Sequence, residues 1–137
     1  MPIEIQTPKP AIQILTWNNK VTLTEINDSH EATYAMAKAQ GISRYVHILV
    51  MTNLASFPFD PMGLWEVLFK HPEVVAVLVV DGPMMARTIT TMLNAITRKV
   101  TLENFDTLEE AQLRAEELVA DSAQLLHPAV TETERTT

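Results

Sequence analysis

Cysteine is absent from the 137-residue sequence, and glycine occurs only three times. Without cysteine, the chain has no disulfide, no thiolate metal ligand and no cysteine nucleophile. Gly41, Gly63 and Gly82 lie too far apart for the glycine-rich loops that bind dinucleotides or nucleotide phosphates. These absences exclude several common classes of enzyme.

Basic residues are also scarce, since 10 Lys and Arg stand against 17 Asp and Glu. The net charge of −7 argues against a nucleic acid partner, because a surface that follows phosphates needs positive charge. The longest apolar run, 74–80, is far shorter than the ~20 residues of a membrane-spanning helix. No secretion signal is recognisable at the N-terminus. We therefore expect a cytoplasmic protein without a membrane span.

The length and a hydrophobic content of 47% predict one globular domain. Three prolines punctuate residues 1–10, which we expect to be an N-terminal extension in which Ile3 and Ile5 add at most a short edge strand. The domain itself is expected over residues 11–121. Residues 122–137 lack apolar periodicity and are expected to form a flexible acidic tail.

Hydrophobic periodicity and turn residues predict five strands and four helices. The expected elements are strands 11–17 and 21–26, helix 29–40, strand 46–51, helix 61–71, strand 74–80, a helix ending near 98, strand 100–103 and a helix after Thr107. The first two strands form a hairpin, and the runs 46–51 and 74–80 are central strands. The order β-β-α-β-α-β-α-β-α predicts an α/β fold with a mixed, mostly parallel sheet of about five strands.

No catalytic or metal-binding group of residues can be assembled. The four histidines are scattered, and no serine lies in the glycine-flanked turn of a hydrolase, so we predict no metal site, no cofactor and no enzyme. Asp60 and Asp81 both follow central strands, at the sheet edge where α/β proteins bind ligands. The simpler interpretation is that each one caps the helix that it precedes.

The expected second helix carries more apolar surface than one sheet face needs. One face is formed by Leu64, Val67 and Leu68, and a second, here called the apolar stripe, by Met62, Trp65 and Phe69. We predict that the apolar stripe, with Phe57 and Phe59 of the preceding loop, binds a protein partner or a second copy of the chain. The alternative is that neighbouring loop or terminal residues cover the stripe within the same domain.

The sequence D-P-M-G-L, Asp60 to Leu64, together with the order of elements, resembles the STAS domain of bacterial anti-sigma-factor antagonists. In that family the helix opens with an Asp-Ser-Ser/Thr-Gly-Leu-like motif, which Asp60, Gly63 and Leu64 match. The segment F-D-T-L-E-E-A, 105–111, is similar to the strand-to-helix passage of STAS and SEC14-like relatives. The resemblance spans residues 11–120 and implies an interaction domain that docks a protein through the loop and helix 55–70.

The sequence departs from this family at one functional position. Members that act as partner switches are phosphorylated on the serine after the aspartate, where this chain has Pro61 followed by Met62. Neither residue has a hydroxyl, so the usual switch cannot operate at this position.

Two other functions stay open. A SEC14-like resemblance implies a domain that binds a small molecule or a lipid, in a pocket between the third and fourth helices. In the third helix, Met85, Ile89, Met92 and Ile96 are expected to form the apolar inner face. An enzyme that uses Asp60 or Asp81 as general acid or base is the third hypothesis.

Overall fold

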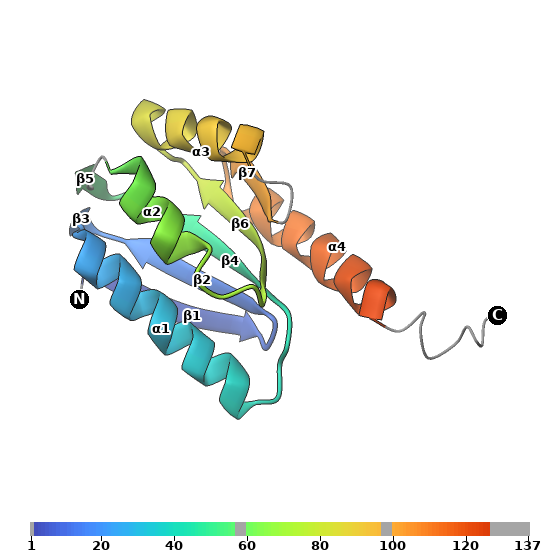
Figure 1. Ribbon diagram of the computed structural model, residues 1–137. Helices are drawn as coiled ribbons and strands as arrows, with labels where there is room; N and C mark the ends of the chain where they lie inside the picture. The colour runs from blue at the N-terminus through green and yellow to red at the C-terminus, as the bar shows by residue number, and fades with distance from the viewer. Residues whose placement is uncertain (1, 57–59, 97–99, 127–137) are drawn as a thin grey trace.

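The computed structural model describes residues 2–56, 60–96 and 100–126 and contains one main sheet flanked by helices (Figure 1). The elements are β1 (Ile3–Lys9), β2 (Ile12–Trp17), β3 (Asn19–Lys20), α1 (Leu23–Ala39), β4 (Tyr45–Val50), β5 (Leu54–Ser56), α2 (Pro61–Leu68), β6 (Val74–Val80), α3 (Met84–Ile96), β7 (Thr101–Phe105) and α4 (Leu108–Leu126). The predicted α/β class, with a five-stranded mixed sheet and four helices, is confirmed.

The main sheet has the order β1-β2-β4-β6-β7. Strand β1 is antiparallel to β2, and the other neighbouring pairs are parallel. The two apolar runs predicted as central strands are β4 and β6, which lie at and beside the centre of the sheet and are almost entirely buried. Strands β3 and β5 pair separately in a small parallel sheet.

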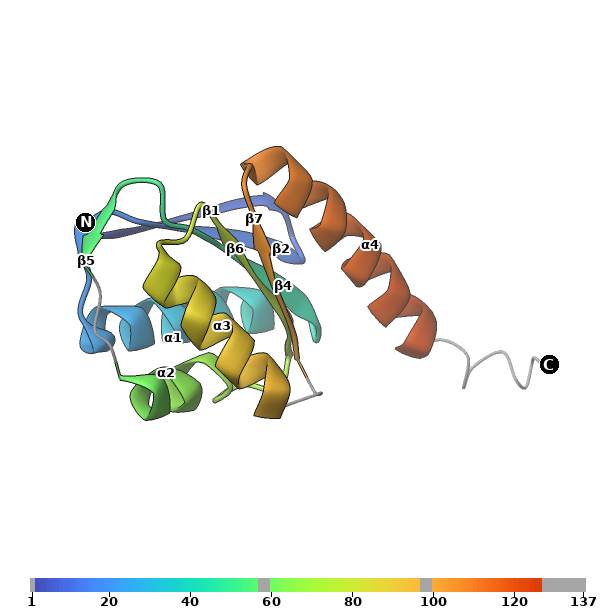
Figure 2. The ribbon, with the colours of Figure 1, turned by 90° about the horizontal axis from the view of Figure 1, so that it is seen from above.

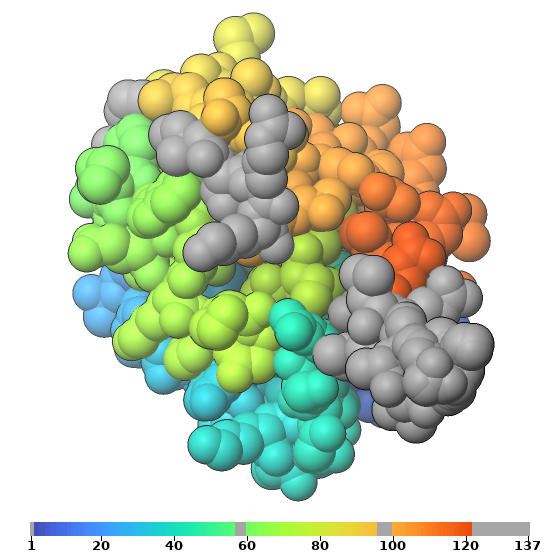
Figure 3. All heavy atoms as spheres, turned by 45° about the vertical axis from the view of Figure 1, so that its right-hand side comes forward, coloured from blue at the N-terminus to red at the C-terminus, as the bar shows by residue number. Residues whose placement is uncertain are grey.

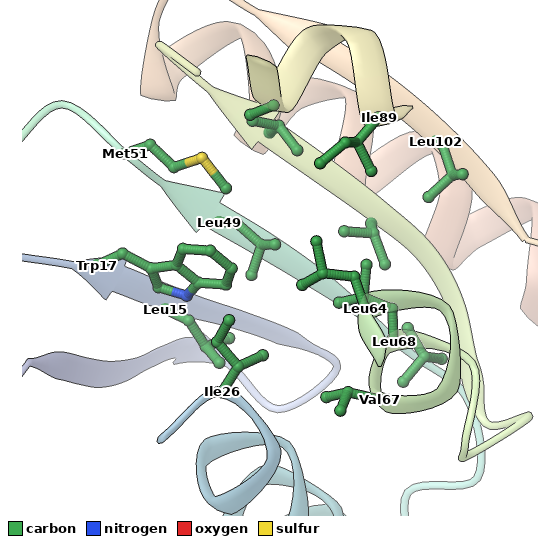
Figure 4. Close-up of a cluster of buried hydrophobic side chains, with 14 of the residues drawn as sticks. Leu15, Trp17, Ile26, Leu49, Met51, Leu64, Val67, Leu68, Ile89 and Leu102 are labelled. Carbon is green, nitrogen blue, oxygen red and sulfur yellow. The ribbon is translucent and has the colours of Figure 1, made fainter. Parts of the chain in front are cut away.

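Helices cover both faces of the sheet, because successive strand residues point to opposite faces and both sets are apolar. Helices α1, α2 and α3 lie on one face and α4 lies on the other (Figure 2). The larger core, under the three helices, contains Trp17, Leu49, Leu64 and Ile89 (Figure 4). Because α3 and α4 pack on opposite faces, the pocket expected between the third and fourth helices is not possible.

The opening hairpin lies earlier in the chain than predicted. It is formed by β1 and β2, in which Ile3 is paired with Trp17 and the chain turns at residues 10–11. Residues 3–9, from the segment expected to be an extension, thus form an edge strand of the main sheet. Asn19 has the positive φ, 58°, that was expected of an asparagine in a hairpin turn. It is, however, the first residue of the short strand β3 and does not connect two strands of a hairpin.

The predicted strand at 21–26 is wrong, because α1 begins at Leu23 instead of near residue 29. The reason is a capping box, in which Glu25 N–H donates to Thr22 Oγ1 at 3.2 Å and Thr22 N–H donates to Glu25 Oε1 at 2.8 Å. This pair satisfies two backbone donors at the helix start and outweighs the β propensity of the threonines and Val21.

The C-terminal elements follow the prediction more closely. Glu110 N–H donates to Thr107 Oγ1 at 3.3 Å at the start of α4, as the capping motif suggested. Helix α4 continues to Leu126, so residues 122–126 of the expected tail are helical, and residues 127–137 lie outside the described residues. None of the described helices combines the length and the apolarity needed to cross a membrane.

Candidate partner-binding surface

The carboxyl ends of the parallel strands meet at one edge of the sheet, and α2 and α3 begin there. In α/β proteins this edge commonly binds ligands, because loops and helix starts gather there above a rigid sheet. The two aspartates lie at this edge, and the apolar stripe runs from it along α2, from Met62 to Phe69, which lies five residues before β6 begins.

The start of α2 is built by Asp60 and Pro61. The Oδ1 atom of Asp60 accepts a hydrogen bond from Gly63 N–H at 3.0 Å, and Pro61 occupies the first helical position, where its missing N–H costs nothing. The predicted capping role of Asp60 is confirmed. The first turn of α2 has no hydroxyl group, since Pro61 and Met62 precede Gly63.

Gly63 allows α2 to approach α1 closely. A Cβ atom at this position would lie 2.6 Å from Asp60 Oδ2 and 2.7 Å from Leu23 Cδ2, both well inside van der Waals contact. The glycine of the D-P-M-G-L sequence therefore has a packing role, which holds the first turn of α2 against the start of α1.

The apolar stripe is divided between core and solvent. Met62 is 71% exposed, whereas Trp65 and Phe69 are partly buried and pack against the larger core. The Trp65 and Phe69 rings meet edge to face, with centroids 4.8 Å apart. The domain thus covers part of each aromatic ring, and Phe57 and Phe59, the other residues predicted for this surface, lie outside the described residues.

The exposed sides of both aromatic residues line a surface groove of about 520 Å³. Its other walls include Asn27 of α1 and the polar residues Glu66 and Lys70 of α2. Aromatic rings that are anchored in a core and open on one side are typical hot-spot residues of protein interfaces. A partner that binds in the groove would therefore contact aromatic rings that are already held in place, and no flexible segment would have to become ordered.

Further exposed methionines, which were not predicted, lie at the start of α3. Met84 and Met85 are 82% and 48% exposed. The sequence pattern placed Met85 and Met92 on the inner face of α3, but the structure buries Ala86, Ile89, Thr90 and Leu93 there. The Thr90 hydroxyl is satisfied within the helix, because it donates to Ala86 O at 2.8 Å. Ile96 belongs to α3, but its side chain lies outside the described part.

The two aspartates do not form a buried acidic pair. Both Asp60 and Asp81 are exposed, and Asp60 is engaged as the helix cap. Asp81 has a φ of 53°, and its N–H donates to Phe105 O at 2.8 Å, which ties the end of β6 to the end of β7. This arrangement lacks the desolvated surroundings typical of a catalytic acid.

A buried polar layer lies beneath α1, where sequence reasoning assigned only plain histidines. His47 Nε2–H donates to Gln13 Oε1 at 2.9 Å, and Gln13 Nε2 donates to Thr33 O at 3.1 Å. His30 packs edge to face on His47, with ring centroids 4.6 Å apart. Burial lowers the pKa of His30 to about 4 and that of His47 well below its ordinary value.

Comparison with known proteins finds similarity in structure. No family model and no curated protein matches the sequence. An uncharacterised protein of the DUF3478 family from Shewanella loihica PV-4, with a SpoIIAA-like fold, has 15% identity and a TM-score of 0.57, over 82% of this chain and 91% of that one.

Two structures of the anti-sigma factor antagonist SpoIIAA are similar as well. The unphosphorylated form has 13% identity and a TM-score of 0.54, over 83% of this chain and 97% of that one. The phosphorylated form, from Bacillus, has 15% identity and a TM-score of 0.57, over 82% and 97%. The described chain, with its five-stranded mixed sheet and four helices, therefore has the SpoIIAA-like fold of the anti-sigma factor antagonists.

Proposed function

We propose that this protein is a non-enzymatic, cytoplasmic interaction domain that docks a protein partner, or a second copy of itself, through the loop and helix 55–70. The proposed surface comprises Phe57, Phe59, Asp60, Met62, Trp65 and Phe69. The observation that carries the proposal is the exposure of Met62 one helical turn before Trp65, which lines a groove together with Phe69 and is anchored with it on the core. Methionine side chains adapt to different partners, and aromatic anchors supply most of the binding energy of interfaces.

Pro61 gives this surface a regulation different from that of the phosphorylated antagonists. A phosphate adds nearly two negative charges at a helix start, which disrupts docking when it stands inside an interface. Because the first turn of α2 has no hydroxyl, we propose that the surface is permanently competent to bind. Control of docking then depends on the abundance of the partner or on competition for it.

Site-specific photo-crosslinking in the native cell tests the proposed surface. A photoreactive phenylalanine analogue at position 62 should crosslink the same partner reproducibly. The matched control is position 113 on α4, because Leu113 is 66% exposed on the opposite side of the sheet. Crosslinks that are equal from both positions, or absent from position 62, would contradict the proposal.

A charge substitution supplies the affinity measurement once the partner is known. Met62→Glu should weaken binding at least tenfold, about 1.4 kcal/mol, while thermal stability stays within about 0.5 kcal/mol of the wild type because the side chain is exposed. Leu113→Glu should leave affinity unchanged. Met62→Glu is a cleaner test than Trp65→Glu, because Trp65 also packs on the core and its loss lowers stability.

The lipid-binding alternative lacks a suitable cavity in the described part of the larger core. The apolar space between α2, α3 and the sheet has a volume of about 30 Å³, which is room for about one or two water molecules. A lipid tail would require α2 and α3 to separate from the sheet.

A further inference from the structure

A second cleft opens at the opposite edge of the sheet, where β4 and β6 begin. Its volume is about 500 Å³, and it lies between the C-terminal end of α1, the loop 41–44, the start of β4 and residues 72–73 before β6. Figure 3 shows the end of α1 and its following loop beside the segment that leads to β6. Volumes of this size are typical of small-molecule sites.

Two buried oxygen atoms of this cleft have no hydrogen-bond partner among the described residues. Tyr45, the first residue of β4, is 1% exposed, and its hydroxyl is unpaired, as is Oε1 of Glu73. Burial raises the pKa of Tyr45, so the phenol stays protonated and can donate. Six buried side-chain atoms of the described residues lack a hydrogen-bond partner, and these two oxygens are the pair that shares one cleft, where a bound group would complete them.

Three charged side chains of the cleft are also unpaired. Lys38 and Arg44 are exposed on its walls, and neither they nor Glu73 forms an ion pair within the part of the chain that the structure describes. A simple anion such as phosphate would be repelled by Glu73, and a simple cation by Lys38 and Arg44. A ligand that carries both charges satisfies all three residues.

Apolar side chains form the rest of the cleft. Ala37, Ile42 and Pro72 line it, and the Tyr34 ring stacks on His71 with centroids 3.9 Å apart, which fixes the ring in place. The C-terminal end of α1 contributes the negative end of a helix dipole, which favours a positive group nearby. The cleft therefore combines an acidic position, a basic position and an aliphatic wall.

We propose that this cleft binds a free α-amino acid with an aliphatic side chain. The Glu73 carboxylate accepts hydrogen bonds from the ligand ammonium group. The ligand carboxylate accepts from the Tyr45 hydroxyl and pairs with Arg44 and Lys38, and its side chain packs on Ile42 and Pro72. This site does not depend on the proposed partner surface, which begins at the other edge of the sheet with Asp60 and Met62 and ends at Phe69, four residues before Glu73.

Titration of the full-length protein with matched probes, followed by backbone amide NMR, tests this site. The probes are L-leucine, L-isoleucine and L-valine, then 4-methylpentanoate, which lacks the ammonium group, 3-methylbutylamine, which lacks the carboxylate, and inorganic phosphate. At least one amino acid should shift the amide signals of residues 41–45 and 73 at concentrations up to about 10 mM. The two single-charge probes and phosphate should bind at least tenfold more weakly.

Two conservative variants locate the binding groups. Tyr45→Phe removes only the hydroxyl, and Glu73→Gln removes only the charge, and each should weaken amino acid binding at least fivefold. Tyr45→Phe should not lower thermal stability, because the lost hydroxyl has no partner. Glu116→Gln, which changes an exposed carboxylate on α4, is the control and should bind like the wild type.

Three results would overturn the proposal. The first is the absence of shifts in residues 41–45 and 73 with all three amino acids. The second is binding of phosphate or of a single-charge probe as tightly as the amino acid, and the third is wild-type affinity in both variants.

Discussion

At the scale of single residues, the buried histidines beneath α1 link the fold to pH. His30 is on α1 and His47 is on β4, so the contact between their rings joins the helix to the sheet. Neighbouring groups also act on them: His71 disfavours a positive charge on both rings, His30 disfavours one on His47, and Glu31 favours one on His30. Desolvation is the largest effect, and it keeps both imidazoles neutral in the folded state.

We predict that acid weakens the fold before the carboxylates titrate. The pKa of His30 is about 4 in the folded state against 6.5 ordinarily, so the unfolded chain binds more protons between these values and stability falls as pH drops from about 6.5 toward 4. At pH 5 the loss from this residue is on the order of 1–2 kcal/mol. Urea unfolding at pH 7 and pH 5 measures it.

A variant separates this effect from general acid denaturation. His30→Leu removes one buried titrating group, so its stability should fall less between pH 7 and pH 5 than that of the wild type. His71→Gln is the comparison at a half-buried histidine of the same region. An equal fall in His30→Leu and the wild type would show that His30 does not control the acid response.

At the scale of elements, cap chemistry explains both the success and the failure of the sequence predictions. The helices after Asp60 and Thr107 were predicted from their caps, and both caps are present. The start of α1 was missed although Thr22 and Glu25 show the same S/T-x-x-E spacing. The β-branched residues around them favoured a strand, and tertiary packing decided otherwise.

The inner face of α3 shows a second limit of periodicity. Ala86 and Thr90 are buried, whereas the larger methionines of this helix are exposed. Apolar periodicity could not predict this, because it does not contain the space that is available between a helix and the sheet. The same limit applies to the partner surface. The pattern located the apolar stripe, but only the packed structure shows that Trp65 and Phe69 are half covered while Met62 is free.

The packing of α2 on α1 leads to a prediction for Gly63. Gly63→Ala places a methyl group within 2.7 Å of Leu23 Cδ2 and 2.6 Å of Asp60 Oδ2, so it should destabilise the protein by about 1–3 kcal/mol. Glu66→Ala, at an exposed position of the same helix, should change stability by less than about 0.5 kcal/mol. Thermal unfolding of both variants provides the measurement. Equal stability of Gly63→Ala and the wild type would show that α2 can move away from α1 at little cost.

At the scale of the whole molecule, one sheet separates two cores. Ile89 of α3 is buried in the larger core and Ala111 of α4 in the smaller one, and the strands between them belong to both. The mostly parallel character of the sheet was predicted from the alternation of strands and helices, because parallel neighbours need crossover helices. The cleft at the amino edge could not be predicted, since it joins residues near 40 to residues near 73 through tertiary packing alone.

Because the sheet separates the two cores, we predict that substitutions in them change the free energy of unfolding independently, although the protein unfolds in a single transition. Ile89→Val should cost about 0.5–1.5 kcal/mol and Ala111→Leu about 1–3 kcal/mol by overpacking. The double variant should lose the sum to within about 0.5 kcal/mol, because the two sites share no contacts. Near-ultraviolet and far-ultraviolet circular dichroism should report one common midpoint. Two separate midpoints would show that the helical layers unfold independently.

Strand β4 runs from the cleft, where Tyr45 begins it, to the sheet edge at which the proposed partner surface begins, near the starts of α2 and α3. Six residues of strand span about 20 Å, which is more than a single amino acid can bridge. An amino acid at Tyr45 and a protein partner at Met62 would therefore not touch each other. The two proposals therefore predict that an amino acid bound at Tyr45 does not prevent a partner from docking on Met62.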